Sequence, residues 1–321
     1  MLAEFLLTPD ALSDNDDRNG TDVVRELTEC FFPSRATPLA LVCKLGEEWE
    51  QAASKKIARI SNSNHRQGAM SLFQKLLREI CIVRPAVQRT SDNESDWVIA
   101  GTTSANHVPL SKIVVSNQIT PPATLGVSIK EFVSHEFWEQ FPNPRLVGRE
   151  TAMQEPVLRA ICTHSDWIIL RLPQIHGGSD DEIVTVKQIV RLATKLPHGY
   201  TKSDIELQIP LDSRPNAADL LQAVKNVLQT LVSPGVNLKV IVVPQGAFVN
   251  REMLAGDYAK DSSGHKKRRA RWWVTMNHVA VGTRRDAGRD DANSWCLYSR
   301  RDADTRLAEI HAVTSLECAT L

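Results

Sequence analysis

A dense run of basic residues is the most chemically distinctive segment of the sequence. Clusters of cations bind phosphate backbones by releasing condensed counterions, and neighbouring aromatic side chains can stack on bases. The run therefore predicts contact with nucleic acid or another polyanion. The alternative interpretation is a solvated basic segment followed by tryptophans that face the core. Alternation places Trp272 and Trp273 on opposite faces of a strand, so we expect at least one of them in the core. The residues that we predict to bind nucleic acid are Lys266, Lys267, Arg268, Arg269, Arg271 and Trp272, with Arg284 and Arg285 as an extension if the fold brings them close.

Carboxylates and histidines at the ends of predicted strands could support phosphodiester hydrolysis. A two-metal nuclease needs several carboxylates that converge on cations. Asp212 is the single carboxylate directly after a predicted strand of the second half, and one is too few. The sequence therefore predicts no metal site and no cofactor. Asp212 and His265 remain the two catalytic candidates, and whether the chain is an enzyme stays open.

His265-Lys266-Lys267 is followed by a predicted strand and then by Val281-Gly282-Thr283. With these residues, the segment from Trp167 to Gly282 resembles one lobe of the phospholipase D superfamily. In that family the histidine is the nucleophile and the lysine holds phosphate, but Trp272 stands where an Asp is expected. The family usually needs two copies of the motif, and this chain has one imperfect copy. The resemblance implies a non-catalytic binding version of the domain, or catalysis through a partner chain.

Alternation of strands and helices sets the expected architecture of the second half. Strands are predicted at 167–172, 204–209 and 238–243, with helices at 183–196 and 216–232 between them. This order favours right-handed crossovers and a mixed, mainly parallel sheet with flanking helices. After a polar loop at 244–266, we expect strands at 271–281 and 295–298 and a last helix at 302–313.

The first half predicts a smaller mixed α/β part. Short strands are expected at 5–7, 39–42, 97–100 and 113–115, and helices at 22–32, 47–60, 66–83 and 128–141. Paired prolines around the last of these helices indicate a boundary. The predicted organisation is an N-terminal domain at 1–125, a linker helix at 126–150 and a C-terminal α/β domain at 151–321.

Composition places the chain among soluble, cytoplasmic proteins. No apolar run is long enough to span a membrane, and the six cysteines stand singly, as reduced thiols do. Charge is balanced overall at 38 basic and 38 acidic residues, but the two ends differ. Residues 1–50 hold 11 acids and 4 bases, whereas residues 251–306 hold 13 bases and 8 acids. Such asymmetry is typical of a basic functional surface or of mutually attracting ends.

Three functions follow from these observations. The first is a non-catalytic nucleic-acid-binding or scaffold subunit of an intracellular assembly, with its contact surface around residues 265–273. The second is a nuclease or phosphodiesterase of the kind that serves bacterial anti-phage defence, with His265 or Asp212 in its site. The third is a pure protein-interaction subunit that contacts a protein partner or forms a homo-oligomer, in which aromatic residues mark the interface. The sequence alone leaves all three open.

Overall fold

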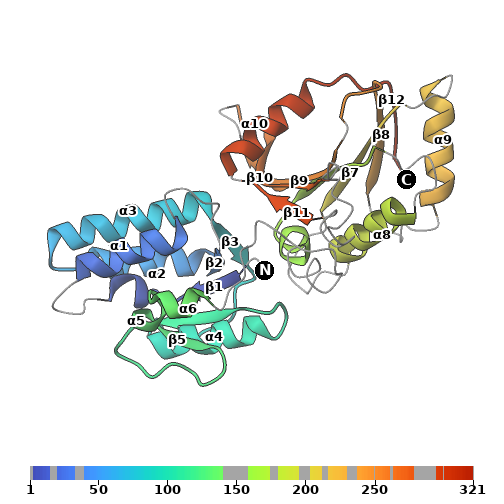
Figure 1. Cartoon of the computed structure of the whole chain (residues 1–321). Coiled ribbons are helices and arrows are strands. Elements are labelled where there is room, and N and C mark those ends of the chain that lie inside the picture. Colours follow the sequence, from blue (N-terminus) through green and yellow to red (C-terminus); the bar gives the residue numbers. More distant parts are fainter. Residues whose placement is uncertain are drawn as a thin grey trace, which may run out of the picture. The chain divides into compact units, whose positions relative to one another are not determined.

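The computed structural model divides the chain into two compact units, and each is described by itself. The first unit comprises residues 1–143, and the second comprises nearly all of the remainder. Figure 1 traces the chain through the elements of both. The structure describes residues 3–14, 20–32, 40–139, 158–173, 180–194, 203–211, 216–229, 237–248, 250–260, 263–277, 294–298 and 300–320.

An all-parallel, five-stranded sheet forms the centre of the first unit. Its strands stand in the order β3-β2-β1-β4-β5, so the chain crosses from one side of β1 to the other between β3 and β4. The elements are β1 (Ala3–Leu7), the short 3-10 helix η1 (Ala11–Ser13), α1 (Gly20–Phe31), β2 (Ala40–Leu45), α2 (Gly46–Ala58), α3 (Ser63–Glu79), β3 (Cys81–Arg84), α4 (Glu94–Ala105), β4 (Lys112–Val115), β5 (Gly126–Ser128), α5 (Ile129–Phe132) and α6 (His135–Glu139).

Helices on both sides of this sheet explain its apolar central strands. All five residues of β1 are buried, as expected for a parallel sheet covered on both faces. In Figure 1, α1, α2 and α3 lie together on one side of the sheet and α4 lies on the other. Phe5 of β1 meets Phe132 of α5 and Trp138 of α6 at ring-centroid distances of 5.0 and 5.4 Å. These aromatic contacts attach α5 and α6 to the core of the first unit.

The second unit is built on a mixed sheet of seven strands in the order β11-β10-β9-β6-β7-β8-β12. Strands β6, β7 and β8 are parallel, and the other ladders among the described residues are antiparallel. The elements are β6 (Trp167–Arg171), α8 (Asp180–Thr194), β7 (Asp204–Pro210), α9 (Ala217–Leu228), β8 (Leu238–Val243), β9 (Arg251–Lys260), β10 (Lys266–Asn277), β11 (Ser294–Leu297), α10 (Arg300–His311) and β12 (Glu317–Thr320).

A bulge divides the long β9–β10 hairpin into two parts. Ala270 pairs with Gly256 and Trp272 pairs with Ala255, which leaves Arg271 as an extra residue on β10. Such a bulge bends and twists the strand that contains it. Gly256 is required there, because a Cβ at this position would lie 2.0 Å from the carbonyl oxygen of Arg269.

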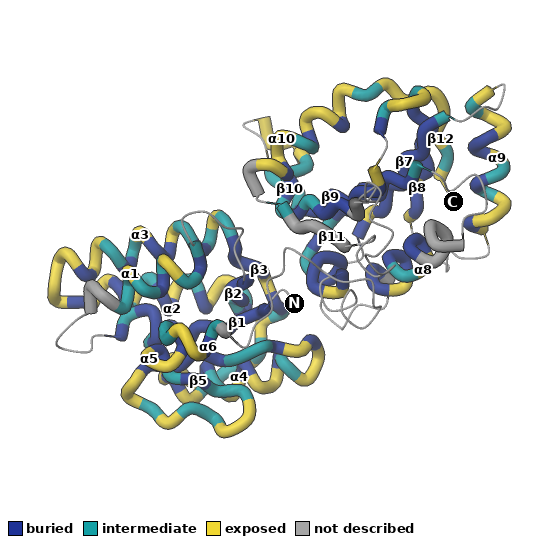
Figure 2. The backbone as a smooth tube through the Cα atoms, in the orientation of Figure 1, coloured by how far each residue is buried: buried dark blue, intermediate teal, exposed yellow. Residues whose placement is uncertain are grey.

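Helix α10 covers one face of the sheet of the second unit. Ala303, Leu307 and Ile310 on this helix pack against Trp167, Ile169 and Leu254. Figure 2 shows the strands at the centre of the sheet as buried and the outer side of α10 as exposed. The core thus lies between the helix and the middle of the sheet, and the far end of the β9–β10 hairpin lies outside it.

The predicted mixed α/β class is confirmed, and two local predictions are wrong. Residues 97–100 lie in α4 rather than in a strand, because Asn93 caps the helix and Trp97, Ala100 and Ser104 form one buried helical face. The predicted loop at 244–266 contains β9. This strand is held between β6 and β10, and it makes the sheet less parallel than we expected.

Two further boundaries differ from the prediction. The helix expected at 66–83 ends at Glu79, and Cys81–Arg84 forms edge strand β3. The linker expected at 126–150 starts with β5, α5 and α6, which belong to the first unit because that unit extends to Asn143. Among the described helices, none is long and apolar enough to cross a membrane.

Two candidate functional sites

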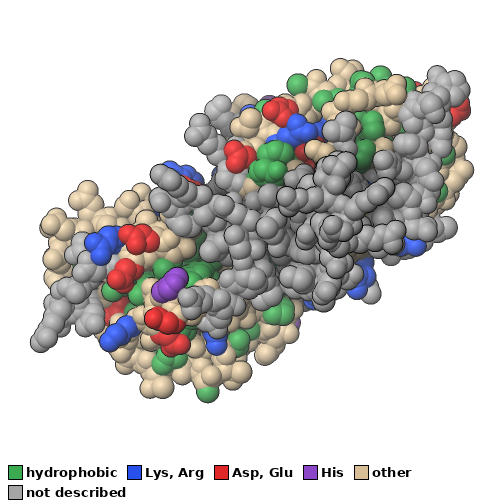
Figure 3. All heavy atoms as spheres, in the orientation of Figure 1, with side chains coloured by type: hydrophobic (Ala, Val, Ile, Leu, Met, Phe, Trp, Pro, Cys, Tyr) green, Lys and Arg blue, Asp and Glu red, His purple; other side chains and the backbone are tan. Residues whose placement is uncertain are grey.

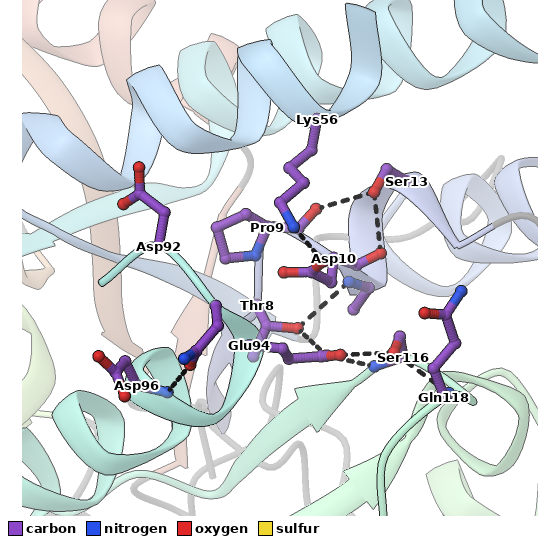
Figure 4. Close-up of polar contacts among 12 residues, drawn as sticks. Thr8, Pro9, Asp10, Ser13, Lys56, Asp92, Glu94, Asp96, Ser116 and Gln118 are labelled. Carbon is purple, nitrogen blue, oxygen red and sulfur yellow. Dashed lines mark hydrogen bonds and ion pairs between the residues drawn. The ribbon is translucent and has the colours of Figure 1, made fainter. Parts of the chain in front are cut away.

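The carboxyl ends of β1 and β4 form the first candidate site. Open α/β sheets bind ligands beyond the carboxyl ends of their strands, where the strand order reverses direction. In the first unit that position lies between β1 and β4. Thr8 and Asp10 follow β1, Ser116 follows β4, and Glu94 opens α4. Figure 4 shows these side chains turned toward one another.

Glu94 connects both strands to α4. One carboxylate oxygen accepts hydrogen bonds from the Thr8 hydroxyl and from the Ser116 backbone N–H, both at 2.6 Å. The other oxygen accepts a hydrogen bond from the Ser116 hydroxyl at 2.5 Å. Glu94 is 8% exposed, and it lies in the first turn of α4, where the helix dipole favours a negative charge. The three hydrogen bonds hold the Glu94 side chain in place between β1 and β4.

The two neighbouring aspartates also have partners within the first unit. Asp10 forms an ion pair with Lys56 of α2 at 2.5 Å. Asp14, which is 6% exposed, accepts a hydrogen bond from the backbone N–H of Asn117 at 2.6 Å. His65 at the start of α3 is buried, and burial lowers its pKa, an effect that the charge of Asp14 opposes.

We call the cluster of Thr8, Asp10, Asp14, Glu94 and Ser116 the clasp, because its hydrogen bonds and its ion pair connect the ends of β1 and β4 to neighbouring helices. Glu94, Asp10 and Asp14 each direct an oxygen at a donor from another element. Within the residues that the structure describes, no group of three or more His, Cys, Asp or Glu side chains is arranged to hold a metal ion. The arrangement joins β1, β4, α2 and α4.

The basic run forms the second candidate site, on β10 of the second unit. Beyond the bulge, and among the described residues, Lys266–Arg269 pair with Asp257–Lys260 alone, because β6 begins at Trp167 opposite Gly256 and the described β10–β11 pairs begin at Val274. We call these two paired segments, 257–260 and 266–269, the ribbon. The ribbon is a two-stranded extension of a seven-stranded sheet.

Three of the five predicted bases that lie on β10 have acidic partners. Arg268 pairs with Glu206 of β7 at 2.9 Å. Arg269 and Arg271 both pair with Asp257, at 2.8 and 3.1 Å. Burial alone would raise the pKa of Asp257, but hydrogen bonds and charges from the two arginines outweigh burial, so its pKa lies below the usual value. Figure 3 shows acidic and basic side chains intermixed over the region of α10.

The end of the ribbon carries the exposed cations. Lys266 and Lys267 are exposed, as is Lys260 across the hairpin. His265 is also exposed, and its Nδ1 lies 2.9 Å from the hydroxyl of Ser263. The cations that face solvent are thus concentrated at the end of the hairpin, next to the histidine that the phospholipase D resemblance singled out.

The aromatic residues near the ribbon are buried or already contact other side chains of the second unit. Trp272 is 5% exposed. Trp273 stacks on Tyr298 with a centroid distance of 4.0 Å and donates its Nε1–H to Glu252 at 2.9 Å. Of the remaining predicted site residues, Asp212, Arg284 and Arg285 lie outside the described residues.

A buried ionic network lies farther along β9, on the other side of the bulge from the ribbon and on the face that α10 covers. Glu252 of β9 accepts hydrogen bonds from Arg171 at 2.6 Å, from Arg306 of α10 at 2.7 and 2.9 Å, and from Trp273. The Arg171 side chain is 1% exposed and that of Glu252 is 2% exposed. Burial lowers the pKa of Arg171, and the charge of Glu252 opposes that change. This network holds α10 on the sheet.

Sequence reasoning missed the Glu94 clasp and the Glu252 network. The wrong strand prediction at 97–100 concealed the start of α4. The signal was present, because Asn93 is a favourable N-cap residue and Asp96, three positions later, donates its backbone N–H to the Asn93 side chain. Thr8 and Asp10 directly after a buried strand were a second signal, since polar residues at such ends converge in parallel sheets.

Comparison with known proteins assigns no family to this chain. No protein-family model matches the sequence, and no curated protein matches it.

Proposed function

We propose that this chain is a non-catalytic nucleic-acid-binding protein, and that its contact surface is the ribbon at the end of the β9–β10 hairpin. One observation carries the proposal. The exposed cations Lys260, Lys266 and Lys267 lie together on a two-stranded extension that projects past the end of β6.

Electrostatics gives the ribbon its affinity for phosphates. Each phosphate that a lysine or arginine neutralises releases counterions, and the logarithm of the binding constant falls by about 0.9 per contact for each tenfold rise in salt. Lys266 and Lys267 are better placed for this than Arg268, which already pairs with Glu206. We therefore assign most of the salt-sensitive binding to the exposed lysines.

The clasp of the first unit supports binding rather than cleavage. A nuclease that uses metal ions needs carboxylate oxygens directed at the cations. Glu94 instead directs both oxygens at Thr8 and Ser116. Rearranging it to bind a metal would break three hydrogen bonds in a buried position.

A charge-removal experiment tests the proposal. The double variant Lys266→Ala/Lys267→Ala should bind labelled nucleic acid about 10- to 100-fold more weakly near 0.1 M salt, and the slope of log K against log salt should fall by about 1.8. The matched control is Lys187→Ala/Lys239→Ala, which removes two exposed lysines from the same unit and should leave the slope unchanged. Fluorescence anisotropy across a salt series measures both quantities.

Three outcomes would contradict the proposal. Unchanged binding by the Lys266/Lys267 variant would remove the ribbon from the contact surface. Cleavage of the probe in Mg²⁺ would favour the nuclease alternative. Absence of binding at low salt would favour the protein-interaction alternative, and a concentration-dependent mass in size-exclusion chromatography would then reveal self-association.

A further inference from the structure

We infer that the ribbon enters the major groove of double-stranded B-form DNA. This inference rests on the proposed function and adds the class of nucleic acid. It follows from the width of the ribbon, from the distribution of its cations over two faces and from the state of its aromatic residues.

The ribbon has the dimensions of a groove-binding element. Neighbouring strands lie about 4.8 Å apart, and four residue pairs extend about 13 Å. The major groove of B-DNA is about 12 Å wide and about 8.5 Å deep, and it admits a two-stranded β-ribbon. A full sheet would be too wide, but the described pairing beyond Gly256 leaves just β9 and β10 side by side. Tyr258 and Arg268 contact β7, and Tyr258 also packs against the core under α10. The two pairs beyond them, Lys260–Lys266 and Ala259–Lys267, can therefore enter where the rest of the sheet cannot.

Cations lie on both faces of the ribbon. Residues opposite each other in an antiparallel pair share a face, so Lys266 lies with Lys260. Lys267 and Arg269 lie on the other face, where the Arg269 side chain is 41% exposed despite its pair with Asp257. An element with one cationic face would suit a flat contact along a strand. Cations on both faces suit a groove, which has a phosphate wall on each side.

The aromatic residues argue against single-stranded nucleic acid. Proteins that bind single strands without sequence preference stack bases on open aromatic rings. Tyr258, the aromatic residue of the described ribbon, donates its hydroxyl to Asp204 at 2.9 Å, and Lys266 lies 5.5 Å from its ring centroid. Trp272 at the base is buried, and Trp273 is stacked on Tyr298. These rings already have contacts within the protein.

RNA duplexes fit the ribbon less well than DNA. The major groove of an A-form helix is deep and narrow, and side chains do not reach its base edges. A ribbon about 10 Å wide with its side chains meets only the phosphate rims of such a groove. The arrangement therefore predicts a preference for DNA over RNA of the same sequence.

The test compares four probes with the full chain: a short DNA duplex, the RNA duplex of the same sequence, and each single DNA strand. We expect the dissociation constant for the DNA duplex to be at least about tenfold lower than for the others. Methylation of guanine N7, which lies in the major groove, should weaken binding. Methylation of adenine N3, which lies in the minor groove, should have little effect.

The variant Lys266→Ala/Lys267→Ala distinguishes failure of this inference from failure of the proposed function. Equal affinity for all four probes, with a loss in the variant, would overturn the groove assignment and leave nucleic-acid binding by the ribbon intact. Interference at adenine N3 alone would overturn it in the same way. Equal binding by the variant and the unaltered protein would overturn both.

Discussion

The clasp of the first unit and the ribbon of the second are both clusters of charge, but they differ in where the partners of those charges lie. In the clasp, the carboxylates of Glu94, Asp10 and Asp14 meet hydroxyl, ammonium and backbone N–H groups of the same unit. At the end of the ribbon, Lys266 and Lys267 project into solvent. The carboxylates of the clasp have partners within the protein, whereas the lysines at the end of the ribbon are exposed.

This difference teaches that a count of charges along the chain says little until their partners are known. The first fifty residues are strongly acidic, yet Asp10 and Asp14 are engaged in holding strands together. In the basic run, Arg268, Arg269 and Arg271 have ion pairs. We therefore expect charges with internal partners to act on stability, and charges that face solvent to act on binding.

Removing Glu252 should have the largest effect on stability. In Glu252→Ala, the guanidinium of Arg171 remains buried without its carboxylate, and such a loss costs about 3–5 kcal/mol. Arg306 and Trp273 lose their acceptor as well. Urea denaturation should show the decrease in the free energy of unfolding of the second unit.

Glu309 supplies the matched control for Glu252. It pairs with the same arginine, Arg306, but its side chain is 57% exposed, so Glu309→Ala should cost at most about 1 kcal/mol. Equal costs for the two variants would contradict the division between buried and exposed charges on which the comparison rests.

Replacing Glu94 should lower the stability of the first unit, by less than the loss of Glu252 lowers that of the second. Glu94→Ala removes the acceptor of three hydrogen bonds and should destabilise the first unit by about 2–3 kcal/mol. The control is Glu131→Ala, an exposed carboxylate in the first turn of α5, which should change stability by at most about 0.5 kcal/mol. Thermal unfolding measures both. If the cluster were an empty metal site with repelling carboxylates, Glu94→Ala would instead raise stability, and Mg²⁺ would stabilise the unaltered protein.

The architecture was largely accessible from the sequence because its signals are local. The apolar runs at 167–172 and 238–243 predicted β6 and β8, and the stripes at 47–60 and 216–232 predicted α2 and α9. The failures occurred where a segment takes its structure from distant neighbours. Strand β9 includes the polar residues Arg251, Glu252 and Asp257, and it became a strand because β6 and β10 pair with both of its edges.

The candidate sites were less accessible for the same reason. The basic run was visible as a cluster, but its division into paired and exposed bases depends on Glu206 and Asp257, and Glu206 lies 62 residues from its partner Arg268. Glu94 reaches Thr8 across 86 residues and Ser116 across 22. Sequence patterns indicate which groups could act, and the fold decides which of them already have partners.

Replacing Asp257 should have the smallest effect on stability. Asp257 bears on both stability and binding, because it forms ion pairs with Arg269 and Arg271 of the basic run. Its pKa is lower in the folded protein than in the unfolded chain, since the arginines outweigh the effect of burial. A lowered pKa contributes stability that is present above about pH 4 and is lost as the pH falls through the folded-state value. Asp257→Asn should remove this contribution, about 1 kcal/mol, from the free energy of unfolding near neutral pH and leave little difference in acid. Urea titrations at a series of pH values measure both.

The same substitution should strengthen binding of nucleic acid, because it releases Arg269 and Arg271 from their acidic partner. We expect affinity at low salt to rise a few-fold and the salt slope to steepen by about 1. Asp219→Asn on α9, an exposed aspartate of the same unit, makes the same change in net charge away from the ribbon and should leave the slope unaltered. If Asp257→Asn lowers stability near neutral pH but leaves binding unchanged, the paired arginines have no share in the contact, and binding belongs to the exposed lysines alone.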